Sequence, residues 1–401
     1  MSSSYQIFFD GQPADADFYT VIASLEVEEN MDLPGAVQLS LPVNRSQAGD
    51  LTYVSDTRLR PMGNLAVVVN PPSGTATAVA GAAASLAGVA GGGNGSNAEC
   101  IFDGYVLSQK LHLNTGVADS TLTVWGQDAS WLMNLTEKIK EWVDVTDADA
   151  ANSIFGDYGI TPADENTVED SPSHTESGHS LMQRASDIQF LRTLARRNGK
   201  FCRVVCTDKP GVRTGYFAAP KLDAKPAATF SITDPQAWNV QSLDLQWEVT
   251  VPSEVIARQA LFTDSDPNGA SADSSDTGLP LLGDRGLAEF SSSPMTVLLA
   301  APVDDGGELA LRAQSLLRES AWFVRCEGEA DLAQLGVVLR VGMIVTIEGI
   351  GALHSGKYLV WSVRHMITPD DHKMKFVLVR NAVGKSAVGG AGGLAALVGA
   401  L

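Results

Sequence analysis

The chain has 401 residues, with 28 Lys and Arg against 47 Asp and Glu, and therefore a formal net charge of −19. Domains of about 100–200 residues predict two to four domains, and a hydrophobic content of 44% excludes a mostly disordered chain. Phosphate binding requires clustered Lys and Arg, so this charge argues against nucleic acid as a partner. The sequence shows neither a secretory signal nor an apolar run long enough for a transmembrane helix. We therefore expect synthesis in the cytoplasm and no stable membrane insertion.

Residues 1–128 are predicted to form a first, tube-like β-barrel module. Apolar and polar residues alternate with a period of two, as on half-buried strands, in segments 18–22, 25–28, 37–41, 65–69 and 120–125. Strand signals also occur at 100–107, after an insertion at 72–98 that is rich in Ala and Gly. We interpret this insertion as a loop between two strands. It is either flexible or a packing segment that becomes ordered against a partner.

Residues 129–238 are predicted to form an α/β insert domain. The clearest helix is expected at 180–198, with Ser180 as its N-cap and Gly199 just after its end. An apolar stripe with a spacing of three or four residues supports this helix: Leu181, Ala185, Ile188, Leu191, Leu194 and Ala195. The other elements expected here are a helix at 147–158 and a strand at 201–206.

Residues 239–382 are predicted to form a second tube-like β-barrel module, followed by a flexible Ala- and Gly-rich tail at 383–401. An acidic and Ser-rich loop at 264–285 and a helix at 309–325 interrupt this module. Its strands are expected at 241–248, 255–263, 343–348, 357–365 and 373–380. The predicted fold class is mainly β, with two barrel modules flanking an α+β region, and the two similar modules suggest a duplicated, ring-forming unit.

A search for chemical motifs finds none that is complete. Ser180 follows Gly178 and His179, but it lacks the second Gly and the preceding strand of a nucleophile elbow. His174 and His179 lie in an acidic loop without the ligand spacing of a zinc site. The four cysteines have neither redox nor disulfide-framework spacing, and Cys202 and Cys206 are expected to be buried. We therefore predict no catalytic residue, no metal ligand, no cofactor and no enzymatic activity, and we interpret His365 as structural.

Two groups of side chains leave alternatives open. A basic face on the expected helix is either solvated or contacts another subunit or an acidic partner; its members are Arg184, Arg192, Arg196 and Arg197. Exposed tryptophans would provide stacking platforms for glycans, but most of the seven are expected in the core. They are Trp125, Trp131, Trp142, Trp238, Trp247, Trp322 and Trp361.

Three stretches match the motifs of one protein family. Residues 183–199 are similar to an S/N-D-x-x-FL-x-x-LA-x-x-x-G helix, and residues 341–365 to a closing G-x-x-V-x-I-x-G … SG-x-Y-x-V-x-x-V-x-H run. Residues 125–133 are similar to a G-x-D-x-S-x-L-L junction after the first module. In this order they resemble the phage late control protein D family, the hub of contractile-tail baseplates. That family is related to type VI secretion valine–glycine-repeat spike proteins and to hubs of contractile injection systems.

The resemblance implies a homotrimer whose two modules per chain form a six-fold-like ring. Such a ring adapts the hexameric tail tube to the trimeric spike, with other baseplate components as further partners and cargo in the lumen left open. Part of the Asp and Glu excess is hypothesised to face the channel. The protein would be made in a bacterial or archaeal cytoplasm and then join the tail or injection particle, including after release from the cell. No needle-like repeat follows Arg380, so piercing is expected to belong to another chain.

The residues that the resemblance singles out are structural or interfacial and not catalytic. Those of the expected helix would fix the insert domain, and the glycines near the end of the chain would make turns of the last module. The full set is Asp187, Phe190, Leu191, Leu194, Gly199, Gly342, Gly349, Gly356, Tyr358 and His365. The alternative to a hub is a β-rich cell-wall or glycan hydrolase, or a glycan-binding protein.

Overall fold

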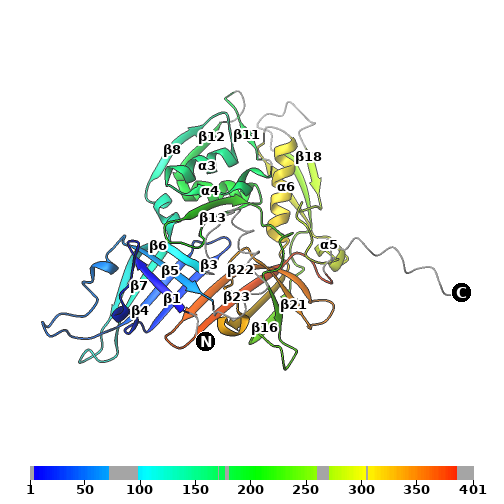
Figure 1. The fold of residues 1–401 in the computed structure, drawn as a ribbon. Coiled ribbons are helices and arrows are strands. Elements are labelled where there is room, and N and C mark those ends of the chain that lie inside the picture. Colours follow the sequence, from blue (N-terminus) through cyan, green and yellow to red (C-terminus); the bar gives the residue numbers. More distant parts are fainter. Residues whose placement is uncertain are drawn as a thin grey trace.

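The computed structural model describes residues 4–71, 98–169, 171–176, 180–259, 271–303 and 306–385. A 13-stranded sheet that takes strands from both ends of the chain forms its base (Figure 1). An α/β domain and a smaller α+β unit lie above this sheet in the same view. Within the described ranges, no helix is both long and apolar enough to cross a membrane. Residues 72–97 of the predicted insertion and 386–401 of the predicted tail lie outside the described residues.

Six antiparallel strands form the first module, in the spatial order β1-β5-β6-β7-β4-β3. Their bounds are β1 (Ser4–Phe9), β3 (Ser24–Asn30), β4 (Ala36–Val43), β5 (Asn64–Asn70), β6 (Glu99–His112) and β7 (Ser120–Asp128). The predicted insertion is flanked by β5 and β6, which pair with each other, so its predicted place between two strands is confirmed. The strand predicted at 18–22 is wrong. Asp15 caps a short helix there, α1 (Ala16–Tyr19), by accepting a hydrogen bond from the Phe18 N–H.

The second module has six strands in the order β15-β21-β22-β23-β20-β16. Their bounds are β15 (Ala228–Ser231), β16 (Ser242–Trp247), β20 (Val324–Asp331), β21 (Ile344–Glu348), β22 (Gly356–Ile367) and β23 (His372–Arg380). Small elements accompany the two modules: β2 (Gln12–Pro13), the 3-10 helix η1 (Thr57–Leu59) and α7 (Leu332–Leu335).

The two modules repeat one topology. In each, the first strand in chain order pairs with the fourth, followed in space by the fifth, sixth, third and second. A helical turn precedes the fourth strand in both, η1 in the first module and α7 in the second. The repeat differs in one respect, because β1 runs antiparallel to β5 whereas β15 runs parallel to β21. The predicted duplication of a β module is thus confirmed in strand order.

An α/β domain follows the first module, and its own apolar core is separate from that of the sheet. Its elements are η2 (Ala129–Asn134), β8 (Glu137–Trp142), β9 (Val145–Thr146), α3 (Asp147–Asp157), β10 (Thr161–Pro162), η3 (Asp164–Thr167), β11 (Ser173–His174), β12 (Leu181–Ser186), α4 (Asp187–Arg197), β13 (Phe201–Cys206) and β14 (Arg213–Ala218). Thr146, the residue before the predicted start of this helix, caps α3 through a capping box with Asp149.

The helix predicted at 180–198 is wrong in its first third. Residues 181–186 form β12, which pairs with β8 and alternates buried and exposed side chains. The spacing of Leu181 and Ala185 fits one face of a strand as well as one stripe of a helix. The buried Gln183 between them accepts a hydrogen bond from Trp142 Nε1 at 3.1 Å, so this strand carries a polar side chain into the core. Ser180 therefore caps no helix, and α4 begins at Asp187.

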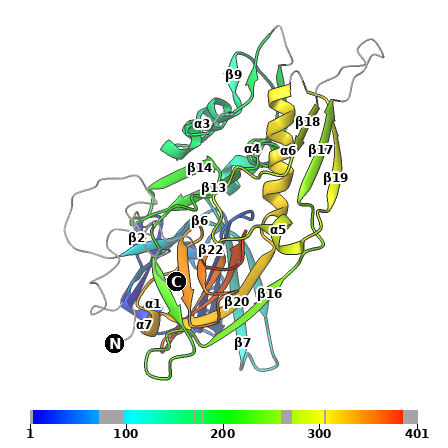
Figure 2. The ribbon, with the colours of Figure 1, turned by 90° about the vertical axis from the view of Figure 1, so that its right-hand side faces the viewer.

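A third unit interrupts the connection between β16 and β20. It consists of β17 (Glu254–Gln259), β18 (Ser271–Ser274), α5 (Leu287–Ser291), β19 (Thr296–Ala301) and α6 (Gly306–Ser320), with α6 packed along the small sheet (Figure 2). Two boundaries differ from prediction. The loop predicted at 264–285 contains β18. The helix predicted at 309–325 is α6, which ends at Ser320, and the chain continues into β20 from Val324.

Candidate assembly surface

The two modules are joined edge to edge by strands from opposite ends of the chain. Strand β3 pairs antiparallel with the second half of β22, so that Val27 lies opposite His365 and Leu25 opposite Ile367. All four of these side chains are buried in the joint. On the other face Arg364 donates to Glu28, with Nη2 and Oε2 2.7 Å apart. This pairing makes one sheet of two modules and shows how an edge of one module accepts the neighbouring module.

A buried ion pair reinforces this joint from above. The guanidinium of Arg340 donates through Nε and Nη2 to Glu29 at distances of 2.6–2.9 Å, and through Nη2 to the carbonyl of Cys206 at 3.0 Å. Glu99 lies 3.4 Å from Nη1. Burial lowers the pKa of Arg340, but the attraction of the Glu29 carboxylate is stronger than this effect. The Arg340 pKa therefore lies above its usual range. The same contacts connect the joint to β13 of the insert domain.

The predicted assembly residues of α4 lie inside the insert domain. Asp187 accepts hydrogen bonds from Lys138 Nζ (2.5 Å), Tyr158 Oη (2.7 Å) and Gln183 Nε2 (2.7 Å). Burial raises the pKa of Asp187, but these donors outweigh that effect and lower it. Phe190, Leu191 and Leu194 are buried in the apolar core of this domain. They stabilise the domain and present no exposed surface.

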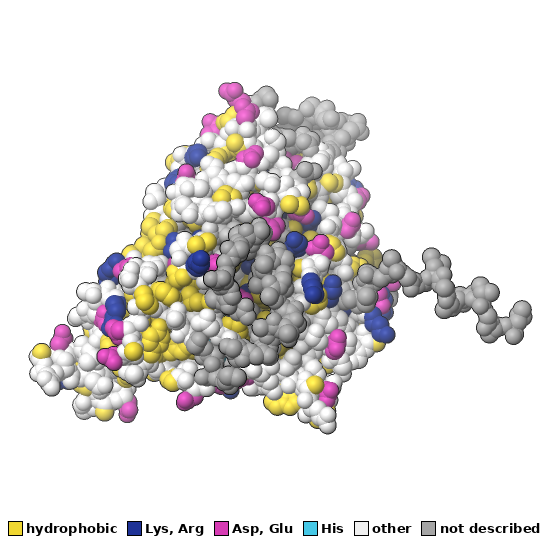
Figure 3. Space-filling view, in the orientation of Figure 1, with side chains coloured by type: hydrophobic (Ala, Val, Ile, Leu, Met, Phe, Trp, Pro, Cys, Tyr) yellow, Lys and Arg dark blue, Asp and Glu magenta, His cyan; other side chains and the backbone are white. Residues whose placement is uncertain are grey.

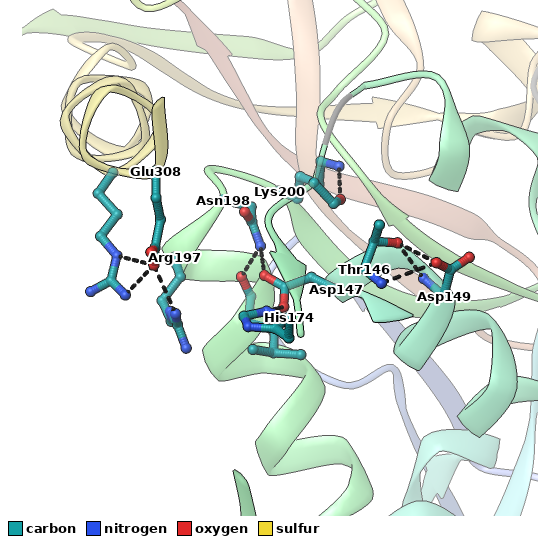
Figure 4. A network of polar contacts seen from close by, with 11 residues as sticks. Thr146, Asp147, Asp149, His174, Arg197, Asn198, Lys200 and Glu308 are labelled. Carbon is teal, nitrogen blue, oxygen red and sulfur yellow. Dashed lines mark hydrogen bonds and ion pairs between the residues drawn. The ribbon is translucent and has the colours of Figure 1, made fainter. Parts of the chain in front are cut away.

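A polar network links the insert domain to α6 (Figure 4). The buried carboxylate of Asp147 accepts a hydrogen bond from Asn198 Nδ2 at 2.7 Å and lies 2.7 Å from His174 Nε2. The bond to Asn198 connects α3 to the end of α4. Arg197 then reaches Glu308 of α6 at 3.3 Å. Another member of the predicted basic face, Arg196, pairs with Asp32 of the first module. Part of that face is therefore used within the chain.

Gly199 is the position where α6 approaches the end of α4. Its φ is +61°, as expected for the residue after a helix, so the predicted role of Gly199 at the end of this helix is confirmed. A Cβ added here would lie 2.7 Å from Arg318 Cδ and 3.0 Å from Ser315 Cα. Glycine thus serves both the turn and the close packing of two helices.

The remaining predicted residues lie in the second module. Gly342 and Gly349 have φ values of +88° and +77°, so both occupy turns that favour glycine, and Gly356 begins β22. Tyr358 is fully buried and donates to the carbonyl of His354 at 2.7 Å. These four residues and His365 are spread along the second module, away from the residues of α4, so the ten predicted residues do not converge on one site.

Burial shifts the pKa of several histidines and cysteines among the described residues. His365 Nδ1 lies 3.0 Å from His372 Nε2, and burial lowers the pKa of both histidines, that of His372 to about 4. Burial raises the pKa of Cys202 and of Cys326 to about 12. No group of three His, Cys, Asp or Glu side chains suited to a metal ion occurs in this part of the chain. Ser180 Oγ donates to Glu141 at 2.6 Å.

Two stretches of strand lack a partner on one side, and sequence analysis missed both. Among the described strands β16 pairs with β20 alone, and residues 108–112 of β6 pair with β7 alone. Leu111, Leu113 and Trp247, on or beside these stretches, are 38%, 51% and 48% exposed. A groove of about 370 Å³ also runs beside β6 where Ser108 and Gln109 line it. Unpaired backbone edges with exposed apolar side chains are typical of surfaces that bind another strand.

Most of the seven tryptophans are expected from the sequence to lie in the core, but three of them are exposed. Trp125, Trp238 and Trp247 are 38%, 45% and 48% exposed. Figure 3 shows hydrophobic side chains gathered over the side where Figure 1 places the first module, whereas charged side chains of both signs are scattered over this face. The exposed apolar surface of the sheet is thus the feature that indicates binding to other proteins.

Comparison with solved structures finds the same fold in phage tail proteins. The tail protein of Neisseria meningitidis MC58 has a TM-score of 0.62 and 13% identity, with 95% of this chain and 97% of that chain covered. The 43 kDa tail protein of prophage MuSo2 from Shewanella oneidensis has a TM-score of 0.62 and 12% identity, with 95% and 100% covered. A component of the type VI secretion system of E. coli has a TM-score of 0.53 and 11% identity, with 95% and 79% covered.

Two sequence comparisons add little to this result. The family model described as the Alg8 N-terminal domain matches residues 88–231, which is well under half of the chain. This match begins between β5 and β6 and ends at β15, so it cuts through both modules. Comparison with curated protein sequences gives no match. The structures, by contrast, agree over almost the whole length, and the chain has the fold of these phage tail proteins.

Proposed function

We propose that the chain is the structural hub of a phage-tail or contractile-injection baseplate, and that three copies form a ring joining the hexameric tail tube to the trimeric spike. The observation that carries this proposal is the repeated module. Each chain holds two modules of one topology, already joined edge to edge by β3 and β22. Three chains would supply six near-equivalent modules, as a hexameric partner requires.

The parts of the chain that do not repeat fit the other side of such a ring. The insert domain and the α6 unit occur once per chain, so a ring of three copies would carry three of each. A closed assembly of this kind has exact threefold and approximate sixfold symmetry, which matches a trimeric spike and a hexameric tube. The net charge of −19 suits a lumen that repels acidic cargo.

Co-purification tests the proposed role. The chain is co-expressed with the tail tube protein and the spike protein of the same particle, captured through a tag on the hub, and imaged by negative stain. The proposal predicts a ternary complex with six lobes in the hub layer. A hub that captures neither protein, or that contains a number of chains other than three, would overturn it.

A further inference from the structure

The joint between β3 and β22 has a counterpart that a single chain leaves unmade. β6 and β22 hold equivalent places, and both contain an irregularity at the same point, between Val106 and Ser108 and between Val360 and Ser362. The preceding turns match too. Met62 N donates to Val106 O, and Val106 N donates to Gly63 O.

The second module repeats this pattern residue for residue. Gly342 N donates to Val360 O, and Val360 N donates to Met343 O. Met62 and Gly342 also share a positive φ, +60° and +88°. Val106 therefore corresponds to Val360, and counting forward from the irregularity places Leu111 at the position of His365.

The same comparison aligns β16 with β3. In the first module, Gly126 of β7 pairs with Val106 of β6 on one side and with Val37 of β4 on the other. In the second module, Leu378 of β23 pairs in the same way with Val360 of β22 and with Cys326 of β20. The partner of Val37 on β3 is Val27, and the partner of Cys326 on β16 is Leu245. Leu245 therefore holds the position of Val27. Within the chain Val27 lies opposite His365, whereas the equivalent pair, Leu245 and Leu111, is not formed.

Burial separates the joint that is made from the one that is not. His365 and Ile367 are 0% and 2% exposed under β3, whereas Leu111 and Leu113 at the equivalent positions are 38% and 51% exposed. Figure 1 places β16 and the β6–β7 hairpin toward opposite sides of the double sheet. One edge cannot cover the other within a chain, but a second copy can supply it.

We propose that β16 of one copy pairs antiparallel with residues 108–113 of the next copy, which are the end of β6 and the residue after it, with Leu111 opposite Leu245 and Lys110 opposite Gln246. The joint has two unlike surfaces per chain, so it is head to tail and closes into a ring or extends as a helix. The closing number of three rests on the proposed function. The strand pairing itself rests on the repeated topology.

The side chains that this register brings together are complementary on both faces. On one face Leu111 and Leu113 meet Leu245 and Leu243, and Trp247 lies opposite Gln109. On the other face His112 lies opposite Asp244, and Ser108 opposite Glu248. Lys110 is then diagonal to both of these carboxylates, within reach of a long side chain. A slip of one residue would set the apolar row against the acidic row.

One difference between the two joints is also complementary. Arg60 and Arg340 precede equivalent turns, in which Gly63 N donates to Arg60 O and Met343 N donates to Arg340 O. Arg340 binds Glu29 in the existing joint. Trp247 holds the position of Glu29 on β16, so the new joint places an indole near Arg60, whose Nη2 donates to Asp10 within the chain. A guanidinium over an indole is a favourable contact of modest strength.

Cysteine cross-linking between differently tagged copies tests the register. All four native cysteines are buried and free. Copies carrying Leu111→Cys are mixed with copies carrying Leu245→Cys and oxidised. The matched control replaces the second variant by Asp244→Cys, one residue away on the other face of β16. A disulfide needs close and aligned Cβ atoms, so the Leu111–Leu245 mixture should give about tenfold more linked dimer than the control. Equal yields would overturn the register.

A second variant separates this inference from the proposed function. Leu111→Lys places a charge in the proposed joint, and Leu135→Lys is its control at a residue that is 56% exposed in the insert domain. Leu111→Lys should abolish oligomers but leave the fold of the single chain intact by near-UV circular dichroism, whereas Leu135→Lys should keep the oligomers. Trimeric rings that tolerate Leu111→Lys would overturn the strand pairing and leave the hub proposal standing. Cross-linked but open-ended chains would support the pairing and contradict the trimeric hub.

Discussion

Arg340 and Glu29, which are 311 residues apart in the sequence, form a buried two-pronged ion pair where the two modules meet. The contact joins the two ends of the chain, because Glu29 lies on β3 and Arg340 lies just before β21. It also connects the joint to Cys206 of the insert domain. The guanidinium of Arg340 therefore connects the second module to the first module and to the insert domain.

Replacing Arg340 by Ala should destabilise the whole fold. The change leaves Glu29 buried without its counter-ion, and breaking a buried pair in this way costs about 3–5 kcal/mol. Arg364→Ala is the matched control, because its pair with Glu28 is exposed and worth about 0–1 kcal/mol. Urea denaturation gives both free energies of unfolding. Similar losses for the two variants would show that the buried pair has no special part in the joint.

Leu191→Asp should prevent folding of the insert domain. Leu191 is fully buried, and an unpaired carboxylate there costs several kcal/mol. Gln189→Asp is the control on the exposed side of the same helix. Soluble yield and near-UV circular dichroism distinguish the two. If the Leu191 variant keeps normal yield, packing and assembly, the placement of α4 in the core is wrong.

Two glycines separate backbone strain from helix packing. Gly159 and Gly199 have similar φ values, +65° and +61°, but only Gly199 faces α6 closely. Ala at either position pays the left-handed backbone cost of about 1–2 kcal/mol. Gly199→Ala should cost about 1–3 kcal/mol more, because its Cβ would displace Arg318 and Ser315. Equal changes in the free energy of unfolding would exclude tight packing between α4 and α6.

Acid should weaken the second module through His372. Burial lowers its pKa from 6.5 to about 4, so the unfolded chain binds this proton at a higher pH than the folded chain does. The free energy of unfolding should therefore fall as pH drops from 6.5 to 4, by about 3 kcal/mol from this group.

His372→Gln removes this proton site, and unfolding measured at several pH values should show a shallower decrease between pH 6.5 and 4. The neighbouring His365 also has a lowered pKa and should leave a residual slope. Parallel curves for the variant and the unchanged protein would contradict the burial of a neutral His372.

Sequence alone predicts the strands of the modules well because their two faces differ. Val37, Leu39 and Leu41 alternate with polar residues and are buried as the period of two requires. It fails at 181–186, where Leu181 and Ala185 satisfy helix and strand periodicity at once. The pairing of β12 with β8, which is a long-range contact, decides between them.

The candidate surface could not be predicted from the local pattern. Leu25 and Val27 on β3 alternate with polar residues in the same way as Leu243 and Leu245 on β16. Only the paired neighbour distinguishes the two strands, since β22 covers β3 and no described strand covers the outer edge of β16. Whether an edge is covered depends on topology, and a single segment of sequence does not encode it.

Native mass spectrometry of the chain, alone and with its tube and spike proteins, decides whether it forms a trimeric hub. The chain has a mass of 42.3 kDa, and we expect a hub of three copies, present alone or formed when either partner is added. A hub that stays monomeric with both partners present, or that closes with another number of copies, would contradict it.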